Sequence, residues 1–379
     1  MATKEKFLIL DFRDDGLELY LLRFDSLTKR VDAKKLKAVG QSPLEAIPKI
    51  KKFLLNIFSF QFPPPKVIIS FSPDFALTYY EHVVLNRDRP NELMTEADLD
   101  NLISQALWKI FDEKRRQSAK QLVLSDLDIL LADTKITDFR IDGRRVLDPL
   151  RHSGREASIG ISQTFVNRTI FKKIVSVLPR RVKLLLVVDG GAATSRLLSS
   201  RFSQSRDFIF ADVLDARTNL YSVSQSSGLK IGFHDYFPWG EKNFFEGVAR
   251  DLKIPVDLIQ SLVKKISEGK VSLTLGRQLK KIISEELAML IHGLERAKET
   301  LKVNSLYLVF RPLRGIDFFP KMVRLVEADR LMEDLGFVFS SDLKNSSISS
   351  IASFLEFYFL REGDILNHIA KRRMRWLMP

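Results

Sequence analysis

Two segments, Leu10–Gly16 (LDFRDDG) and Phe210–Asn219 (FADVLDARTN), decide the fold of this chain. In each segment an apolar run typical of a β-strand ends at an aspartate, Asp11 or Asp212, and passes into a loop. An aspartate at a strand end commonly caps the following turn with its own side chain, and its carboxylate is also a ligand that Mg²⁺ accepts. The residues alone leave both roles open.

Length and composition limit the classes of protein to be considered. The chain has 379 residues, 45% of them hydrophobic, which predicts at least two lobes, each with a buried core. It has no cysteine, which excludes disulfides and thiolate metal sites and fits a reducing compartment. The five histidines show no ligand spacing, so no metal site is expected.

The N-terminal residues enter a strand-like run too early for a signal peptide, so we expect a cytoplasmic protein. No stretch approaches the roughly 18 apolar residues of a membrane-spanning helix. The net charge of +13 allows nucleic acid or an anionic membrane as a partner, and part of the excess lies at the C-terminal end. The basic runs at 114–116, 180–181 and 264–265 lack interleaved aromatic residues, so no nucleic-acid partner is expected.

The first 74 residues have the pattern of an α/β lobe. Two strand-like runs, 7–12 and 17–24, are separated by Asp14-Asp15-Gly16, which predicts a hairpin. Ser42-Pro43-Leu44-Glu45 supplies an N-cap, a proline at the first helical position and a capping-box glutamate, so a helix begins there. The run 66–72 predicts a further strand.

The pattern changes twice more along the chain. Residues 75–166 mix strands with a capped helix that opens at Thr95, which predicts an inserted subdomain. A second lobe begins near Asp207, and its helix 277–300 carries an apolar stripe that indicates core packing. The stripe consists of Leu279, Ile283, Leu287, Leu290 and Leu294.

Several motifs, in this order over more than 300 residues, resemble the bacterial actin homologue FtsA, to which the pilus protein PilM is related in fold. They are Asp11, Phe139–Gly143, Asp148-Pro149, Gly154, Gly190–Ser195, Asp212–Tyr221, Leu229–His234, Pro238–Glu241 and Ala249–Leu252. The resemblance implies an α/β, two-lobed actin-like (ribonuclease-H-like) fold with an FtsA-type inserted α+β subdomain. The implied domains are 1–74 with 167–206, the insert 75–166, the second lobe 207–360 and a C-terminal helix in 361–379.

At the positions of the family's two phosphate-binding loops, this chain lacks the glycines that the family has. Glycines in such loops let the backbone approach phosphate oxygens and aim N–H groups at them. In this chain Arg13 and Asp14 stand at the Gly-Thr positions of the first loop, and Leu214, Asp215 and Ala216 stand at the glycines of the second. If nucleotide binds at all, the resemblance implies a site made by a small set of residues. They are Asp11, Asp14, Asp212, Asp215, Thr218 and Gly315.

The adenosine loop also departs, because Phe310-Arg311 replaces its double glycine. Three separate losses argue against ATP hydrolysis, so we expect a pseudo-ATPase without a cofactor, with ATP and Mg²⁺ as ligands only if the altered cleft still binds them. An active ATPase is the alternative from another class, and convergence of Asp11 and Asp212 on an open cleft would favour it.

The C-terminal segment 364–378 predicts an amphipathic helix, which resembles the membrane anchor of FtsA. A terminal helix docked on the second lobe would bury the same apolar face and remains an alternative. The expected membrane-binding residues are Ile365, Leu366, Ile369, Lys371, Arg372, Met374, Arg375, Trp376 and Leu377.

Together these features predict a cell-division adaptor that tethers an FtsZ-like filament protein to the inner face of the cytoplasmic membrane, with possible self-polymerisation. Lys253, Lys264 and Lys265 are candidate partner-binding residues on family resemblance. A PilM-like platform protein of a type IV pilus, which would bind a short cytoplasmic peptide of a membrane protein, is the alternative within the adaptor class.

Overall fold

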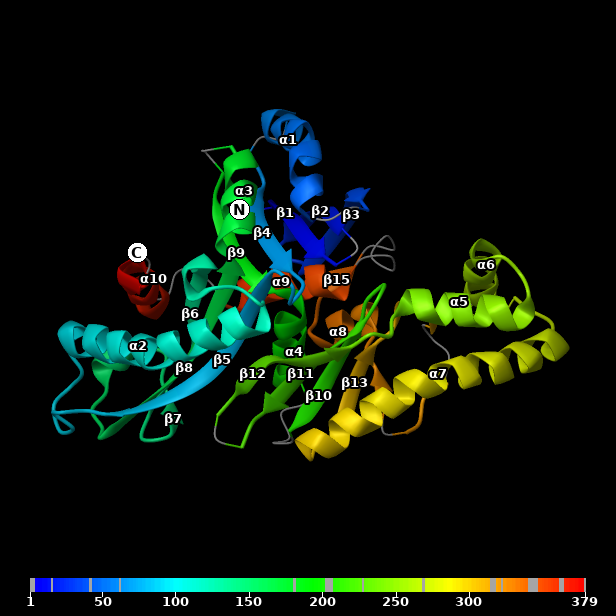
Figure 1. Cartoon of the computed structure of the whole chain (residues 1–379). Helices are drawn as coiled ribbons and strands as arrows, with labels where there is room; N and C mark the ends of the chain where they lie inside the picture. The colour runs from blue at the N-terminus through cyan, green and yellow to red at the C-terminus, as the bar shows by residue number, and fades with distance from the viewer. Residues whose placement is uncertain are drawn as a thin grey trace.

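The computed structural model describes residues 4–377 except 15, 41–42, 61–62, 180–181, 202–206, 227, 268–269, 314–317, 322, 340–346 and 361–364. The chain forms two mixed β-sheets with helices between and outside them (Figure 1). The first sheet has the order β15-β3-β2-β1-β4-β9. Its strands are β1 (Lys4–Arg13), β2 (Gly16–Asp25), β3 (Arg30–Val39), β4 (Lys66–Phe71), β9 (Leu184–Asp189) and β15 (Val338–Phe339).

The second sheet has the order β14-β13-β10-β11-β12-β5-β8-β6-β7. Its second-lobe strands are β10 (Phe208–Val213), β11 (Thr218–Ser224), β12 (Lys230–Phe237), β13 (Ser305–Val309) and β14 (Val323–Leu325). In both lobes the first strand pairs antiparallel with the second and parallel with the fourth. The lobes therefore repeat one topology, and β1 and β10 hold equivalent central positions.

The insert consists of a four-stranded antiparallel sheet with one helix on it. Its elements are β5 (Ala76–Asn86), α2 (Glu96–Gln121), β6 (Ile129–Ile141), β7 (Arg144–Arg145) and β8 (Glu156–Asn167). Short 3-10 turns lie at Asp126–Asp128 and Pro149–Arg151. Thr95 caps α2 in a capping box, as the sequence predicts. The insert sheet continues the second-lobe sheet through one bridge, Ile231 to Tyr80.

Polar side chains attach the insert to the first lobe. The edge strand β9 donates its Val187 N–H to Asp133 Oδ2 at 3.3 Å and its Asp189 N–H to Thr78 Oγ1 at 2.8 Å. Both acceptors belong to the insert, and both are buried. Backbone groups that an open sheet edge would leave unpaired are therefore satisfied by the insert.

The remaining helices lie on both sides of the sheets. They are α1 (Pro43–Phe60), α3 (Arg168–Val177), α4 (Gly190–Arg201), α5 (Glu241–Leu252), α6 (Val256–Ser267), α7 (Leu273–Leu301), α8 (Ala328–Asp334), α9 (Ile348–Phe359) and α10 (Ile365–Leu377), with a 3-10 turn at Arg311–Leu313. Helices α4 and α9 pack against each other in a core that joins both sheets, while α1 and α3 cover the outer face of the first sheet (Figure 1). Helices α5 to α7 cover the second sheet, and all five residues of the expected apolar stripe on α7 are buried there.

The end of the chain returns to the first lobe. Strand β15 pairs with β3 through Val338 and Arg30, and Phe354 of α9 packs against Phe7 and Phe24. The sequence analysis placed residues 207–360 in the second lobe as one block. The structure instead places 338–339 in the first sheet and 348–359 in the core beside it, because the apolar face of α9 is buried against β1 and α4.

Candidate functional site

The carboxyl end of β1 carries the first predicted site residue, Asp11. Its side chain is 1% exposed, and Oδ2 accepts hydrogen bonds from Ser349 Oγ at 3.0 Å and Ser350 Oγ at 2.9 Å. Burial raises the pKa of Asp11, while the nearby Arg13 charge opposes the rise. Helix α9 therefore already supplies donors to the carboxylate that was considered as an outer-shell metal ligand.

The carboxyl end of β10 carries the second, Asp212. Burial raises its pKa to about 6, the charges of Arg13 and Arg311 oppose that rise, and the negative charges of Asp11 and Asp14 add to it. The two loop aspartates of the sequence analysis are thus brought within electrostatic range of each other. An active ATPase would require Asp11 and Asp212 to converge on an open cleft, and the structure meets the first of these two conditions.

The side chain of Arg13 is 5% exposed, although it stands at a position where the family has glycine in its first phosphate loop. Its positive charge lowers the pKa of Asp11, Glu18 and Asp212, which belong to both lobes. An internal guanidinium therefore provides the counter-charge between the two central strands. The sequence analysis treated Arg13 only as an obstruction, and its partners in the fold could not be read from its position in the loop.

The second loop directs its polar groups towards α5. The carbonyl oxygens of Leu214 and Asp215 accept from the N–H groups of Glu241 and Lys242 at 2.8 and 2.9 Å. Leu214 is buried, and a Cβ on Gly240 would lie 2.4 Å from the Asp215 carbonyl oxygen, so this helix start needs glycine. The loop carbonyls thus cap the helix.

Thr218, the expected hydroxyl donor to a metal or phosphate, is fully buried. Its Oγ1 donates to the Trp239 carbonyl oxygen at 2.7 Å. The neighbouring Arg217 forms an ion pair with Asp74 of the β4–β5 connection and lies 4.9 Å from the centre of the Tyr236 ring. These contacts hold the loop to its own lobe and to the other one.

The third expected loop follows β13. Phe310 is buried in an aromatic cluster with Trp239, Phe244 and Phe319 at ring distances of 5.2 to 6.3 Å. Arg311 Nε donates to Glu241 Oε1 at 2.8 Å. Gly315, the remaining nucleotide candidate, lies outside the described residues.

A carboxylate that the sequence analysis did not single out, Asp189, lies at the end of β9 and is fully buried. Its Oδ1 accepts from the Gly191 N–H at 2.9 Å and from the Tyr221 hydroxyl of β11 at 2.8 Å, which links the two lobes. Burial raises the pKa of Asp189 to about 7, against the effect of these hydrogen bonds. The signal was present in the sequence, because Val188-Asp189-Gly190 repeats the pattern of an apolar strand ending at an aspartate.

Helix α10 forms where the sequence predicts it, and its apolar face lies on the insert. Leu366, Ile369 and Ala370 are buried in the insert core, and Met374 packs against that core. Asn367 Oδ1 accepts from the Ile136 N–H of β6 at 2.8 Å, and Asp100 of α2 binds Arg372 and Arg373. The helix is docked, as in the alternative considered from sequence, but on the insert and not on the second lobe.

The other expected membrane residues are distributed differently. Ile365, Arg372 and Arg375 are exposed, Lys371 is half-buried, and the side chains of Trp376 and Leu377 lie outside the described part. None of the described helices is long and apolar enough to cross a membrane. The structure therefore leaves Arg372 and Arg375 exposed at the surface and covers most of the apolar side of α10.

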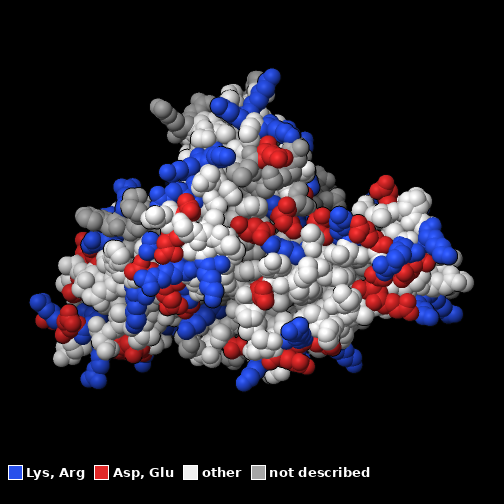
Figure 2. Space-filling model, in the orientation of Figure 1, with Lys and Arg blue, Asp and Glu red and all other residues white. Residues whose placement is uncertain are grey.

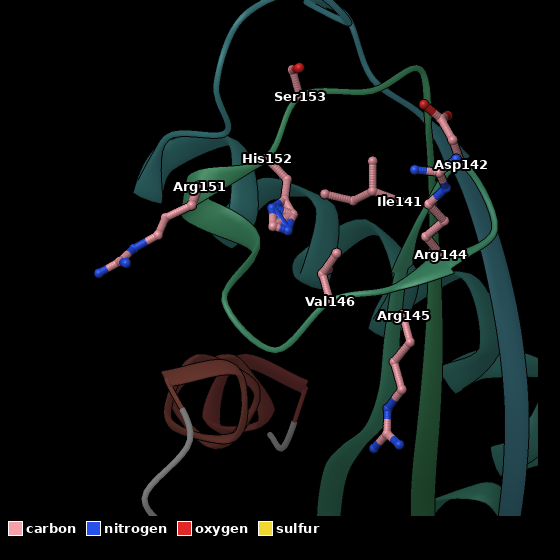
Figure 3. A pocket seen from close by; sticks show the side chains of 8 residues that line it. All are labelled: Ile141, Asp142, Arg144, Arg145, Val146, Arg151, His152 and Ser153. Atoms are coloured by element: carbon pink, nitrogen blue, oxygen red, sulfur yellow. The ribbon is translucent and has the colours of Figure 1, made fainter.

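Two further surfaces carry clustered basic residues. The partner candidates Lys253, Lys264 and Lys265 are exposed at and near α6. The insert carries a depression of about 560 Å³ lined by arginines, but Figure 3 shows that Arg145 and Arg151 point away from its centre. Both are paired, with Asp138 at 3.2 Å and Asp148 at 3.0 Å, so the depression does not gather their charges. In the described part of the chain, no group of three histidine, aspartate or glutamate side chains is placed to hold a metal ion.

No family model and no curated protein matches this sequence. Among solved structures, the chain is similar to a chain of the PilM–PilN type IV pilus biogenesis complex, with 14% identity, a TM-score of 0.50 and 99% of each chain covered. It is also similar to the ethanolamine utilization protein EutJ from Carboxydothermus hydrogenoformans, at 10% identity, a TM-score of 0.39, and coverage of 93% and 92%.

A third similar structure is Ta0583, an archaeal actin homolog, at 11% identity, a TM-score of 0.39, and coverage of 97% of this chain and 99% of that one. Only the first of the three similarities is strong enough to carry an argument, and at this identity it concerns the fold alone. The chain therefore has the two-lobed actin-like α/β fold that the sequence predicts.

Proposed function

We propose that this protein is a nucleotide-independent actin-fold adaptor that joins a membrane-associated assembly through protein contacts. The observation that carries the proposal is the buried Arg13 side chain, whose positive charge acts on Asp11 of the first lobe and on Asp212 of the second. In ATPases of this fold a bound nucleotide lies between the lobes, and its phosphates and cation interact with both. Here a covalently attached cation provides charge compensation at that place.

The residues present fit Mg-ATP poorly. Phosphate binding in such loops depends on backbone N–H groups that face the ligand without intervening side chains. The carbonyls of Leu214 and Asp215 instead cap α5, and the Thr218 hydroxyl is bonded to Trp239. Placing phosphate between Asp11, Asp14 and Asp212 would also bring negative charges together. These contacts support a pseudo-ATPase.

A PilM-like platform role is the best candidate for the partner. PilM is found in a complex with PilN, and this chain matches a chain of that complex over its whole length. We therefore propose a protein partner of the same kind, a short cytoplasmic segment of a membrane protein. The protein would then work at the inner face of the cytoplasmic membrane without entering it.

Tethering of an FtsZ-type filament is the second candidate. It is favoured by the exposure of Lys253, Lys264 and Lys265, which could receive an acidic tail peptide. The test is binding of such a peptide to a variant in which the charges of Lys264 and Lys265 are reversed. If the variant binds the peptide as well as the wild type does, these lysines are not the binding site.

Nucleotide binding is the property that tests the main proposal. Purified full-length protein is titrated with labelled ATP and Mg²⁺ while its melting temperature is followed. We expect no saturable binding and no rise in melting temperature up to millimolar nucleotide. Saturable micromolar binding, with a stability gain that grows as the ligand exceeds its dissociation constant, would overturn the proposal.

A matched pair of variants sharpens this experiment. Arg13→Gly removes the internal cation and restores glycine at the first loop, whereas Arg23→Gly changes an exposed arginine on the same hairpin. If Arg13 replaces the ligand's charge, weak Mg²⁺-dependent nucleotide binding is expected in Arg13→Gly only. Equal binding by both variants and the wild type would show that Arg13 has no such role.

A further inference from the structure

The positive charge of the chain is concentrated in the first lobe. Residues 1–74 and 167–206 contain 22 lysines and arginines against 10 aspartates and glutamates, an excess of 12 out of the net +13 for the whole chain. The insert 75–166 has 13 basic and 15 acidic residues, and the segment 207–360 has 20 of each. The first lobe is therefore strongly basic, whereas the insert and the segment 207–360 are nearly neutral.

Six of these 22 basic residues lie on the two outer helices of that lobe, α1 and α3. The helices pack side by side, and their inner faces, with Ile50, Leu54 and Ile174, are buried on the first sheet. Figure 2 shows Lys and Arg side chains gathered over this end of the molecule, at the top of the view. Four exposed lysines contribute there, and none forms an ion pair with a described residue. They are Lys51, Lys52, Lys172 and Lys173.

Exposed aliphatic side chains lie among these lysines. Leu55 is 45% exposed and follows Lys51 and Lys52 at four and three residues, so all three share one side of α1. Val175 is 43% exposed and follows Lys172 by three residues on α3. The outer surface of α1 and α3 thus alternates ammonium groups with short apolar groups.

We propose that this outer surface of α1 and α3 binds an anionic phospholipid membrane. Lysine ammonium groups on flexible stems interact with lipid phosphates as point charges, and aliphatic side chains between them can enter the interface. The two helices lie on the outside of the sheet and present a broad surface. Among the described side chains of α1 and α3 no aromatic ring is exposed as a platform for stacking bases, since Phe53 and Phe171 are half-buried, which disfavours single-stranded nucleic acid.

The site differs from the membrane contact expected from sequence. That expectation placed the apolar face of α10 in the bilayer, and the described part of this face is packed on the insert instead. The α1 and α3 surface needs no rearrangement of the fold to meet a membrane. The inference rests on the proposed adaptor role only in placing the protein beside the inner leaflet, whose lipids are anionic.

The test is co-sedimentation of the full chain with vesicles of phosphatidylcholine, with and without phosphatidylglycerol, at low and high salt. The reversal variant carries Lys51→Glu, Lys52→Glu, Lys172→Glu and Lys173→Glu. The control variant carries Lys264→Glu, Lys265→Glu, Lys280→Glu and Lys281→Glu, which are four exposed lysines of α6 and α7. Both variants change the net charge equally.

Binding is expected only to vesicles that contain phosphatidylglycerol, and it should weaken with salt. Because each of the four interfacial lysines contributes about 1 kcal/mol, the reversal variant should bind on the order of a thousandfold more weakly. The control variant should remain near the wild type. A second variant with glutamine at the same four positions should be intermediate, which separates loss of charge from misfolding, and circular dichroism checks the fold of each.

Three results would overturn the proposal. The first is an equal loss of vesicle binding in the reversal and control variants. The second is a loss of vesicle binding when Arg372 and Arg375 of α10 are reversed, with no loss when the α1 and α3 lysines are reversed. The third is binding of duplex DNA through the same lysines without binding to vesicles. None of these results depends on nucleotide, and the ATP titration contains no lipid. Failure of this inference and failure of the adaptor proposal are therefore distinguishable.

Discussion

At the scale of single residues, the cleft is organised around charges that the protein supplies itself. Asp11 and Asp189 are buried and Asp212 is half-buried, and the pKa of each carboxyl group is raised. The positive charge of Arg13 and hydrogen bonds from Ser350 and Tyr221 offset part of the cost of burying them. Changes at these positions should therefore alter stability in ways that depend on pH.

Removal of the internal cation should destabilise the fold. Arg13→Ala removes the positive charge that favours the ionised forms of Asp11 and Asp212, and removing the counter-charge of a buried carboxylate costs about 3 kcal/mol. The loss should be larger at pH 8 than at pH 5, because the carboxyl of Asp212, with a pKa of about 6, is mostly protonated at the lower pH. Urea unfolding at both pH values measures the effect.

The control for this prediction is Arg23→Ala, an exposed arginine on β2, which should change the unfolding free energy by less than about 0.5 kcal/mol. If both variants lose equal stability, or if the loss from Arg13→Ala does not depend on pH, the charge role assigned to Arg13 is wrong.

Asp189 should make the protein less stable as the pH rises. Its pKa is raised from 3.8 to about 7 in the folded state, so the folded protein binds more protons than the unfolded chain between these values. The free energy of unfolding therefore falls from about pH 4 to about pH 7, by a few kcal/mol at most. Asp189→Asn keeps an oxygen acceptor for Gly191 and Tyr221 and should remove the part of this dependence that Asp189 contributes, leaving the smaller part due to Asp212.

Denaturant unfolding across the pH range measures the effect, and Asp257→Asn on the exposed surface of α6 is the control that should leave the dependence unchanged. If the free energy of unfolding of the wild type instead rises between about pH 4 and pH 7, the raised pKa of the buried Asp189 is contradicted.

At the scale of secondary-structure elements, close approach between helices and strands is as important as charge. A Cβ on Gly191 of α4 would lie 2.2 Å from the ring of Tyr221 in β11, and a Cβ on Gly190 would lie 2.5 Å from Ser349 of α9. The Gly190-Gly191 pair that opens α4 thus allows β11 and α9 to pack against the start of this helix.

Gly191→Ala should therefore destabilise the protein by about 2 kcal/mol or more, since the fully packed Tyr221 ring cannot move aside without losing its bond to Asp189. Gly276→Ala in α7 is the matched control, because the nearest atom to its new Cβ lies at 3.7 Å. That control should gain up to about 1 kcal/mol from helix propensity. Thermal melts compare the two, and equal melting temperatures would refute the packing argument.

The docking of α10 rests on a polar contact as well as on its apolar face. Asn367→Ala would leave the Ile136 N–H of β6 without its acceptor and should cost about 1–3 kcal/mol. Hydrogen exchange should be faster at the Ile136 amide in particular. His368→Ala, at the next and exposed position of the helix, should leave this exchange rate unchanged. Unaltered protection in Asn367→Ala would show that the docked helix does not depend on this bond.

Most elements could be predicted from sequence, because their local signals agree with their tertiary roles. Thr95 caps α2, and the stripe from Leu279 to Leu294 predicts the buried face of α7. Strand β3 was missed because Lys34, Lys35 and Lys37 obscure its alternation, while only Val31 and Ala33 mark its inner face. The two-residue strand β15 carries no pattern of its own, since pairing with β3 alone defines it.

The candidate site could be predicted only in part, for a related reason. The facing of Asp11 and Asp212 follows from two equivalent strands, which the repeated motif indicates. The roles of Arg13, Asp189 and Tyr221 depend on contacts between residues far apart in the sequence, and neither propensity nor spacing encodes such contacts. The docking of α10 on the insert could not be predicted for the same reason. An amphipathic pattern shows that one helix face will be buried, but it does not identify the apolar surface against which the face packs.

At the scale of the whole molecule, the two lobes share one apolar core. Buried residues of both sheets, among them Phe7, Phe210 and Tyr307, belong to the cluster around α4 and α9. We therefore expect both lobes to unfold in a single calorimetric transition, with equal calorimetric and van't Hoff enthalpies, in the absence of nucleotide. Addition of Mg-ATP should leave this transition in place. Two separate transitions that merge only with nucleotide would contradict the closed, ligand-independent arrangement.

The one bridge between Ile231 and Tyr80 has a mechanical consequence. The insert leaves and rejoins the chain at the first lobe, yet its strand β5 is bonded to the edge of the second-lobe sheet, where Gln121 also donates to the Phe233 carbonyl oxygen at 3.1 Å. A force applied to the insert is therefore divided between both lobes. A partner that pulls on this subdomain would therefore load both lobes at once, and tension on the insert would reach the second-lobe sheet directly as well as through the lobe from which the insert emerges.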